Sequence, residues 1–395
     1  MSKFRMVGLF ALFSAGAVVL PLVACGTTAV AANPHSASPI GKQLAELNGS
    51  DTVAGDEFGY SVAVSGTTAI VGAEYHAFAG GAYVFTKTPT GWKQTAELSP
   101  SDGATAGDFG TSVAISGATA VVGASGVARA YMFAKGATGW KQTAVLKGSF
   151  SFGASVAVSG NTVVVGAPNA ASGAGRAYIF TTSATGWKQA AVLKGSDTKA
   201  GVYPVGDQFG TSVAISGTTA VIGANCHAKN AGRAYVFTKT TTGWKQAAEL
   251  KGSDTVAFNY FGWSVAVAGT TVVVGADDAA YGAGRAYVFT KTAKGWKQAA
   301  ELKGSDTVAG DSFGYSVAVS GTTAVVGANY HANGAGRAYV FTLTAKGWKQ
   351  AAELKGSDTV AGDSFGYSAA VSGTTAVVGG NCHANYAGRA YVFEA

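Results

Sequence analysis

The pattern of apolar and polar positions favours short strands over helices along most of the chain. YSVAVS (315–320) and TAVVGA (323–328) are small and apolar at successive positions, as in strands buried on both faces. RAYVFT (337–342) alternates its aromatic residues onto one face, and WKQAAEL (348–354) alternates inward residues with charged ones, as an outer strand does. A tight Gly-containing turn joins the first two segments. The pattern predicts a unit of four antiparallel strands.

This four-strand unit recurs seven times. Each copy opens with a Phe-Gly dipeptide, and the copies follow one another at intervals of about 50 residues. The seven phenylalanines are Phe58, Phe109, Phe152, Phe209, Phe261, Phe313 and Phe365. Units of this size and number are typical of a β-propeller. We therefore predict an all-β fold, a seven-bladed β-propeller of four-stranded antiparallel blades.

The two ends of the repeat region complement each other. The last unit stops after its third strand, RAYVFE (389–394), whereas KQLAEL (42–47) is a near-copy of the fourth strand KQAAEL (245–250). We expect the N-terminal strand to complete the last blade and to close the ring over residues 41–395. A linear β-solenoid, the alternative for a repeated β sequence, would not need a split terminal unit.

The composition agrees with this fold and limits the classes of partner that the chain is expected to bind. The chain has 57 Gly, 48% apolar residues and 12% charged residues, which suits many short strands, tight turns and a sizeable core. The net charge is +7, but its basic residues are spread over the units. Nucleic-acid binding needs a concentrated basic face, so no nucleic-acid partner is expected.

The N-terminal region has a different composition. Lys3 and Arg5 precede an apolar run, so residues 1–24 are expected to be a secretory signal peptide; an uncleaved membrane anchor is the alternative. LVAC resembles a lipobox ending at Cys25, the expected lipidation site, and AVAA (29–32) is a competing cleavage site. Residues 25–40 would form a flexible tether. The expected location is outside the cytoplasm, as a surface lipoprotein or a secreted protein.

The run FGxSVAVSGxTxVVVGA, with a complete Gly-Ala-Pro at 166–168, resembles the FG-GAP repeat. This family builds the seven-bladed head of integrin α chains and many bacterial surface proteins. The resemblance implies a binding or adhesion module that recognises a protein or a carbohydrate through one loop face. A hydrolase or lyase with a site at the channel mouth, and a structural envelope protein, are the alternatives. We expect a monomer that contacts a membrane only through its lipid anchor.

The chain departs from the family at the calcium loops. Several family blades carry a D-x-D-x-D-G-x-x-D loop between the first two strands, whereas this chain has only SGTT, SGAT, SGNT or AGTT there. Calcium takes six to eight oxygen ligands, carboxylates among them, which these turns lack. No calcium and no other cofactor is therefore expected.

The loops between strands two and three and those between blades are expected on one face, where polar residues gather. The candidate ligand-binding residues are Asp56, Tyr75, His76, Asp207, His227, Trp263, Asp277, Asp278, Asp311, Tyr330, His331, Asp363, His383 and Tyr386. One interpretation makes the Asp residues turn formers and the His residues ordinary surface. The other makes the set a rim for a polar ligand, with Tyr rings for sugars or protein anchors.

Catalysis is not favoured by this pattern. The Asp residues recur around the ring, whereas a catalytic carboxyl pair would be unique. Zinc needs three or four converging ligands, and the loops of each unit offer one or two. Cys226 and Cys382 lie in loops nearly opposite each other and are expected to be free. We therefore predict no enzyme activity and no metal site; if the chain has a unique binding site, its place is between the third and fifth units, where the loops are least regular.

Overall fold

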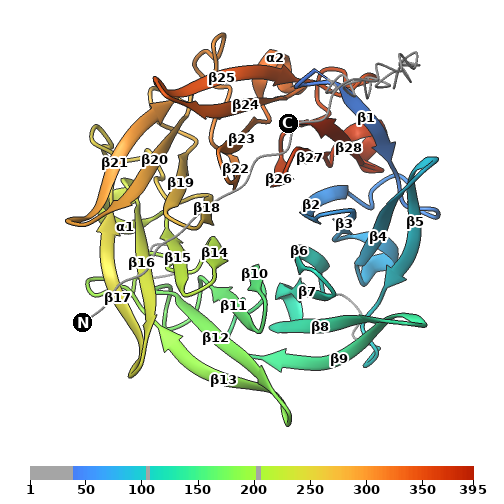
Figure 1. Cartoon of the computed structure of the whole chain (residues 1–395), viewed down its shortest axis with the longest axis horizontal. Helices are drawn as coiled ribbons and strands as arrows, with labels where there is room; N and C mark the ends of the chain where they lie inside the picture. The colour runs from blue at the N-terminus through green and yellow to red at the C-terminus, as the bar shows by residue number, and fades with distance from the viewer. Residues whose placement is uncertain (1–38, 104–106, 202–205) are drawn as a thin grey trace, which may run out of the picture. The chain divides into compact units, whose positions relative to one another are not determined.

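The strand pattern of the sequence folds into a ring of sheets, seen in a computed structural model that describes residues 39–103, 107–201 and 206–395 (Figure 1). Its 28 strands form seven four-stranded antiparallel sheets, which we number as blades in chain order. Blade 1 contains β2–β5, and each later blade takes the next four strands as far as blade 6. Blade 7 contains β26–β28 and β1. The predicted all-β, seven-bladed propeller is confirmed.

The first and second strands of each blade lie nearest the axis. Val and Ala side chains of the first strands, such as Val62 and Val113, line a central channel. The first strands are β2 (Phe58–Ser65), β6 (Phe109–Ser116), β10 (Ser155–Ser159), β14 (Val213–Ser216), β18 (Val265–Ala268), β22 (Ser316–Ser320) and β26 (Ser368–Ser372). The second strands are β3 (Thr68–Ala73), β7 (Thr119–Ala124), β11 (Thr162–Ala167), β15 (Thr219–Ala224), β19 (Thr271–Ala276), β23 (Thr323–Ala328) and β27 (Thr375–Gly380).

The third and fourth strands form the outer half of each blade. The third strands are β4 (Gly81–Thr88), β8 (Arg129–Gly136), β12 (Arg176–Ser183), β16 (Arg233–Thr240), β20 (Arg285–Thr292), β24 (Arg337–Thr344) and β28 (Arg389–Glu394). The fourth strands are β5 (Gly91–Leu98), β9 (Gly139–Lys147), β13 (Gly186–Leu193), β17 (Gly243–Leu250), β21 (Gly295–Leu302), β25 (Gly347–Leu354) and β1 (Gln43–Leu47). Short helical turns sit in five of the loops between second and third strands: η1 (His76–Phe78), η2 (Ser125–Val127), α1 (His227–Asn230), α2 (His331–Gly334) and α3 (His383–Tyr386).

The Phe-Gly dipeptide joins neighbouring blades. Phe58 is fully buried, with its ring 5.5 Å from that of Tyr83 and 6.0 Å from that of Phe85, and its core cluster includes Val377 of blade 7. Gly59 has φ +94°, and a Cβ there would lie 2.2 Å from the carbonyl oxygen of Arg389. The dipeptide is therefore needed for packing between blades and is not a ligand site.

A belt of serine hydroxyls runs around the ring. Ser61 donates a hydrogen bond of 2.7 Å to the carbonyl oxygen of Gly110 in the next blade. The same bond links every following pair of blades: Ser112 to Gly153, Ser155 to Gly210, Ser212 to Gly262, Ser264 to Gly314, Ser316 to Gly366 and Ser368 to Gly59. The last bond returns to blade 1, so the belt fixes the register of all seven blades.

Strand β1 lies at the outer edge of blade 7, beside β28 (Figure 1). The two strands are antiparallel, with Gln43 opposite Phe393 and Leu47 opposite Ala390. An ion pair of 2.9 Å between Arg389 and Glu46 joins them as well. The fourth strand of blade 7 thus comes from the start of the described chain and the other three from its end.

Several sequence-based expectations concern residues outside the described ranges. The signal peptide at residues 1–24, the lipidation site Cys25 and nearly all of the tether at 25–40 lie there. Within the described ranges, no helix is long and apolar enough to cross a membrane.

Candidate functional site

The loop that enters a blade and the loop between its second and third strands are fastened together by an Asp–His pair. In blade 1, Nδ1 of His76 lies 2.8 Å from Oδ2 of Asp56, which is only 5% exposed. The same carboxylate accepts the backbone N–H of Val53 at 2.8 Å. Because an ionised carboxylate can only accept, Nδ1 carries the proton, and Nε2 is left to face Asp51 at 3.6 Å.

Three other blades repeat this pair. The Nδ1–Oδ2 distances are 2.9 Å for His227–Asp207, 2.8 Å for His331–Asp311 and 2.8 Å for His383–Asp363. The imidazole side chains of the four pairs are only 11–15% exposed. Eight of the fourteen candidate residues therefore form buried contacts between loops, and they do not form an open ring of charge.

The backbone of these loops places the imidazole. In blade 4, Ala228 and Lys229, which follow His227, have φ of +53° and +61°. This left-handed stretch turns the chain back, so that the N–H of Gly232 donates to the carbonyl oxygen of His227 at 2.9 Å. The histidine side chain then points toward the loop that enters the blade, where Asp207 lies.

A second Asp, in the Gly-Ser-Asp segment that follows a fourth strand (Pro-Ser-Asp at 100–102), has a different partner. The hydroxyl of Tyr83 donates to Oδ1 of Asp51 at 2.9 Å. The same bond pairs Tyr131 with Asp102, Tyr235 with Asp197, Tyr287 with Asp254, Tyr339 with Asp306 and Tyr391 with Asp358. In blade 3, which has no Asp here, the hydroxyls of Ser149 and Tyr178 bond instead. These aspartates satisfy a tyrosine hydroxyl at the edge of the core.

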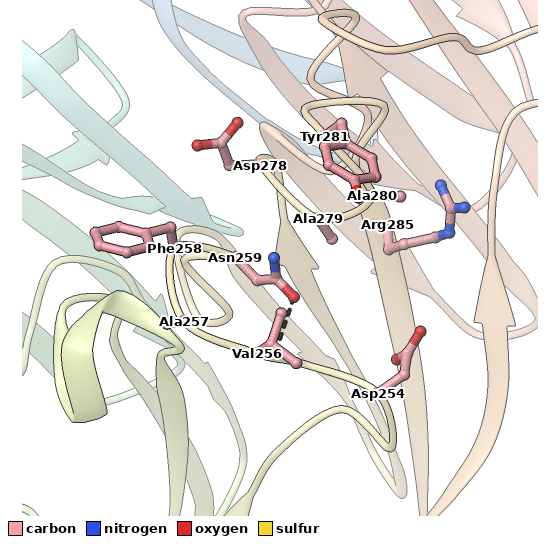
Figure 2. Close-up of a pocket in the computed structure, with 10 residues that line it drawn as sticks. All are labelled: Asp254, Val256, Ala257, Phe258, Asn259, Asp278, Ala279, Ala280, Tyr281 and Arg285. Atoms are coloured by element: carbon pink, nitrogen blue, oxygen red, sulfur yellow. Dashed lines mark hydrogen bonds between the residues drawn. The ribbon is translucent and has the colours of Figure 1, made fainter.

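Blade 5 departs from this arrangement. Asn259 stands at the position of Asp56, and Ala279 stands at that of His76. The amide oxygen of Asn259 still accepts the N–H of Val256 at 2.9 Å, which preserves the turn. A cleft of about 500 Å³ lies between the two loops, and the methyl group of Ala279 is part of its lining (Figure 2).

The cleft of blade 5 combines aromatic and polar groups. Its lining residues are Asp254, Val256, Ala257, Phe258, Asn259, Asp278, Ala279, Ala280, Tyr281 and Arg285. Tyr281 is 96% exposed and Phe258 is 62% exposed, and they come from different loops (Figure 2). Asp254 and Asp278 add exposed carboxylates. Flat rings beside carboxylates and an amide can hold a ligand that has both apolar faces and hydroxyl groups.

A second cleft, of about 600 Å³, lies at the loops of blade 1. Its rim includes Phe78, which is 91% exposed, and Tyr75, which is 50% exposed. Tyr330 and Tyr386, the other tyrosine candidates, are 55% and 52% exposed on the corresponding loops of blades 6 and 7. Exposed aromatic rings thus recur along this face.

Trp263, another candidate, lies at the channel and not on the outer loops. Its ring is 5.5 Å from that of Tyr315, and Tyr367 follows at 5.0 Å and Tyr60 at 5.1 Å. These four side chains form an arc on one side of the channel. The residue after the Phe-Gly dipeptide is smaller in blades 2, 3 and 4, so the channel is asymmetric: Thr111, Ala154 and Thr211.

Two buried carboxyl groups follow the second strands of blades 1 and 5. Burial raises the pKa of Glu74 to about 7, although hydrogen bonds from Thr111 and Tyr75 lower it. Burial also raises the pKa of Asp277 to about 7, whereas its neighbour Asp278 is exposed. Among the described residues, Oε2 of Glu74 and Oδ1 of Asp277 have no hydrogen-bond partner.

The candidate list from the sequence missed Phe78, Phe258, Tyr281 and Glu74. Tyr281 and Phe78 hold equivalent positions in the two loops that contribute to clefts, where blade 4 has Lys229 and blade 6 has Asn333. An aromatic residue at a position that is polar in sister blades was the signal. Cys226 and Cys382 are free, and burial raises the pKa of the Cys226 thiol to about 11, which opposes its use as a nucleophile.

Comparison with known proteins identifies the family of the repeated unit. The family model of the FG-GAP repeat matches all seven units, at residues 42–85, 92–137, 148–180, 187–237, 244–289, 296–341 and 348–393. The chain belongs to the FG-GAP repeat family. A chain of the solved structure titled "Crystal Structure of Mitotic Checkpoint Complex" is similar to this FG-GAP propeller with a TM-score of 0.59. That match covers 99% of both chains at 11% identity, so it shows the fold alone. The search of curated proteins gave no match.

Proposed function

We propose that this FG-GAP propeller is an extracytoplasmic binding module, without enzyme activity, whose ligand is a carbohydrate held in the cleft of blade 5. The location outside the cytoplasm rests on the composition of residues 1–24. A role in binding agrees with the propeller fold, in which seven similar blades present their loops on one face. The proposal that the ligand is a carbohydrate rests on the chemistry of the blade 5 cleft.

The nearly complete exposure of the Tyr281 ring is the observation that carries this proposal. A side chain that is 96% exposed contributes nothing to the core, whereas a flat ring stacks well on the apolar face of a sugar. Phe258 offers a second ring, and Asp254, Asp278 and Asn259 supply acceptors for hydroxyl groups. The volume of about 500 Å³ also lies in the range of about 300–1,000 Å³ that is typical of small-ligand pockets.

A glycan array probed with the purified protein tests the proposal, followed by calorimetry with the best-binding oligosaccharide. Tyr281→Ala should weaken binding at least about tenfold, a loss of about 1.4 kcal/mol, because it removes the stacking ring. Tyr330→Ala is the matched control, since Tyr330 is an exposed ring on the loop of blade 6, and it should bind as the wild type does. Absence of any bound glycan, or equal loss in both variants, would contradict the proposal.

A hydrolase or lyase is the second candidate, and one observation favours it. Glu74 has a pKa of about 7, as general acids and bases often do, and it lies close enough to Tyr60 at the channel mouth to raise that tyrosine's pKa. Incubating the bound glycan with the protein and separating the products distinguishes the two functions. New reducing ends or unsaturated products that Glu74→Gln abolishes would favour the enzyme.

A further inference from the structure

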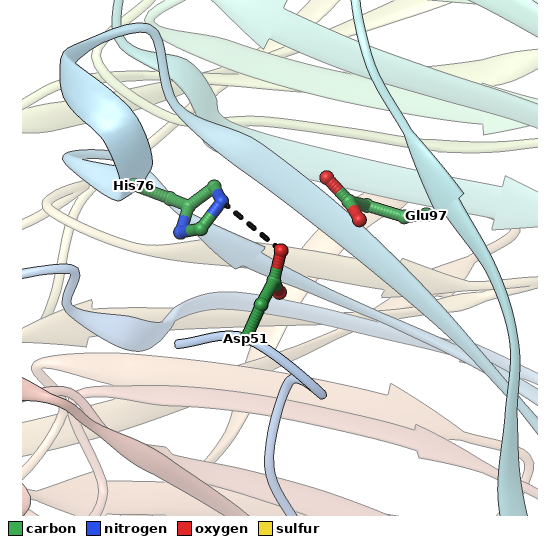
Figure 3. Close-up of side chains that lie close together, drawn as sticks. All are labelled: Asp51, His76 and Glu97. Atoms are coloured by element: carbon green, nitrogen blue, oxygen red, sulfur yellow. Dashed lines mark ion pairs between the residues drawn. The ribbon is translucent and has the colours of Figure 1, made fainter. Parts of the chain in front are cut away.

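Three potential metal ligands converge in blade 1. Asp51 comes from the loop that enters the blade, His76 from the loop between β3 and β4, and Glu97 from β5 (Figure 3). One ligand atom from each lies within 4.8 Å of those of the other two. The sequence-based count of one or two ligands per unit considered the loops alone and did not include Glu97 on β5.

The contacts of His76 and Asp51 orient their ligand atoms. Nδ1 of His76 is bound to the buried carboxylate of Asp56, so Nε2 is the ring nitrogen that faces Asp51 and Glu97. Metal-binding histidines have this arrangement: the ring nitrogen that does not bind the metal donates its N–H to a carboxylate, which orients the ring. The hydroxyl of Tyr83 donates to Oδ1 of Asp51, which leaves Oδ2 of Asp51 to face the space between the three ligand atoms. We call this space the gap.

The distance between these two atoms suits a shared ion better than a hydrogen bond. Nε2 of His76 and Oδ2 of Asp51 are 3.6 Å apart, beyond the usual range of about 2.7–3.2 Å for a hydrogen bond. Two ligands bound to a tetrahedral zinc ion, each about 2.1 Å from the metal, lie roughly 3.4 Å apart. A small movement of the exposed Glu97 side chain would add a third ligand, since its carboxylate already faces the gap (Figure 3).

Blade 1 differs from the other histidine blades at one nearby position. Blade 4 brings the same three residue types together, but Nε of Arg233 bonds to its glutamate, Glu249, at 2.7 Å. The corresponding arginines of blades 6 and 7 make the same bond, Arg337 to Glu353 at 2.7 Å and Arg389 to Glu46 at 2.9 Å. Blade 1 has Gly81 there, and Glu97 has no ion pair among the described residues.

Gly81 also gives the imidazole more room. A Cβ at this position would lie 3.3 Å from Cδ2 of His76. The ring of His76 lies 5.8 Å from that of Tyr83, whereas the equivalent distances are 6.4 Å for His227–Tyr235 and 6.5 Å for His331–Tyr339. The glycine therefore removes a competing cation and lets the imidazole lie closer to the tyrosine ring.

We propose that Asp51, His76 and Glu97 bind one zinc ion, with water as the fourth ligand. One imidazole and two carboxylates are a ligand set suited to zinc, whereas calcium takes six to eight oxygens. The site differs in position and chemistry from the calcium loops between first and second strands. It goes beyond the carbohydrate-binding function and does not depend on it.

Zinc titration of the metal-depleted protein against a competing chromophoric chelator tests this proposal. Cys25, Cys226 and Cys382 are replaced by Ser in every sample, so that no thiol contributes. One zinc ion per chain should bind, and His76→Ala should abolish that binding. Glu97→Gln should weaken it at least about tenfold. Because Glu97 is exposed, this variant should keep the wild-type melting temperature without zinc, which separates lost ligation from misfolding.

Two further variants make the test specific to blade 1. His331→Ala, in blade 6, should leave zinc binding unchanged, because Arg337 already pairs with the glutamate there. Gly81→Arg should weaken binding at least about tenfold by restoring the arginine of the other blades. The proposal is overturned by a wild type that binds no zinc, by full affinity in His76→Ala, Glu97→Gln or Gly81→Arg, or by a loss in His331→Ala equal to that in His76→Ala.

Discussion

Blades 5 and 6 share almost the same strand sequences, yet their loops have different roles. In blade 6, His331 fills the space between two loops and Asp311 holds it there. In blade 5, Ala279 and Asn259 stand in those places. Asn259 still accepts the N–H of Val256, as the equivalent Asp does, and a cleft lies between the two loops. The comparison shows that in a repeat protein the loops of two blades can differ in their contacts and in the cleft between them while the strands stay nearly unchanged. Three predictions test how far this conclusion holds.

The largest effect is expected where blade 5 has Asp277 and blade 6 has Asn329. Burial raises the pKa of Asp277 from 3.8 to about 7. Between these pH values the folded protein holds a proton that the unfolded chain has released, so the free energy of unfolding falls as pH rises through this window. Asp277→Asn removes that loss and should stabilise the protein at pH 8 by on the order of 4 kcal/mol.

Urea unfolding at several pH values measures this difference. The gain of Asp277→Asn over the wild type should be full above pH 7 and should shrink toward zero as the pH falls to 3.8. Asn329→Asp in blade 6 is the matched control, because it should introduce a similar loss at pH 8. A gain that does not change with pH would mean that the charge of Asp277 is not its cause.

The difference between the two blades was only partly predictable from sequence. The strands were predictable because each unit repeats the same alternation and the same turns, and the split last unit indicated that the strand at 42–47 pairs with the one at 389–394. The Asp–His pairs were not, because Asp311 and His331 lie 20 residues apart in loops whose approach depends on the fold.

The roles of Gly81 and of the aromatic loop residues could not be predicted from the sequence alone either. Gly81 is visible as a missing arginine, but its meaning depends on Glu97, which lies on the neighbouring strand opposite Tyr83. Phe258 replaces a glycine and Tyr281 lies in a loop without histidine, so both resembled ordinary loop variation. Asp277 and Asp278 are identical neighbours in the sequence, so the sequence could not show that the first carboxyl is buried and the second exposed.

A smaller effect is expected from removing one member of the pair in blade 6. His331→Ala leaves Asp311, which is 5% exposed, without its imidazole donor, and this should lower the free energy of unfolding by about 1–3 kcal/mol. Adding Asp311→Asn should recover part of that loss, because blade 5 uses Asn259 and Ala279 without the pair. Urea unfolding of the two single variants and the double variant gives the coupling energy. Strictly additive losses would show that the pair is not a unit.

The smallest effect is expected from the reverse change in blade 5. Ala279→His with Asn259→Asp should rebuild the Asp–His contact and fill the cleft with an imidazole, so carbohydrate affinity should fall at least about tenfold, or about 1.4 kcal/mol. Calorimetry with the oligosaccharide chosen from the glycan array measures this change. The melting temperature should stay at or above that of the wild type, since the new side chains copy a contact that four other blades already make. Unchanged affinity would place the carbohydrate elsewhere on the loop face, with the exposed rings of Phe78 and Tyr75 in blade 1 as the next surface to test.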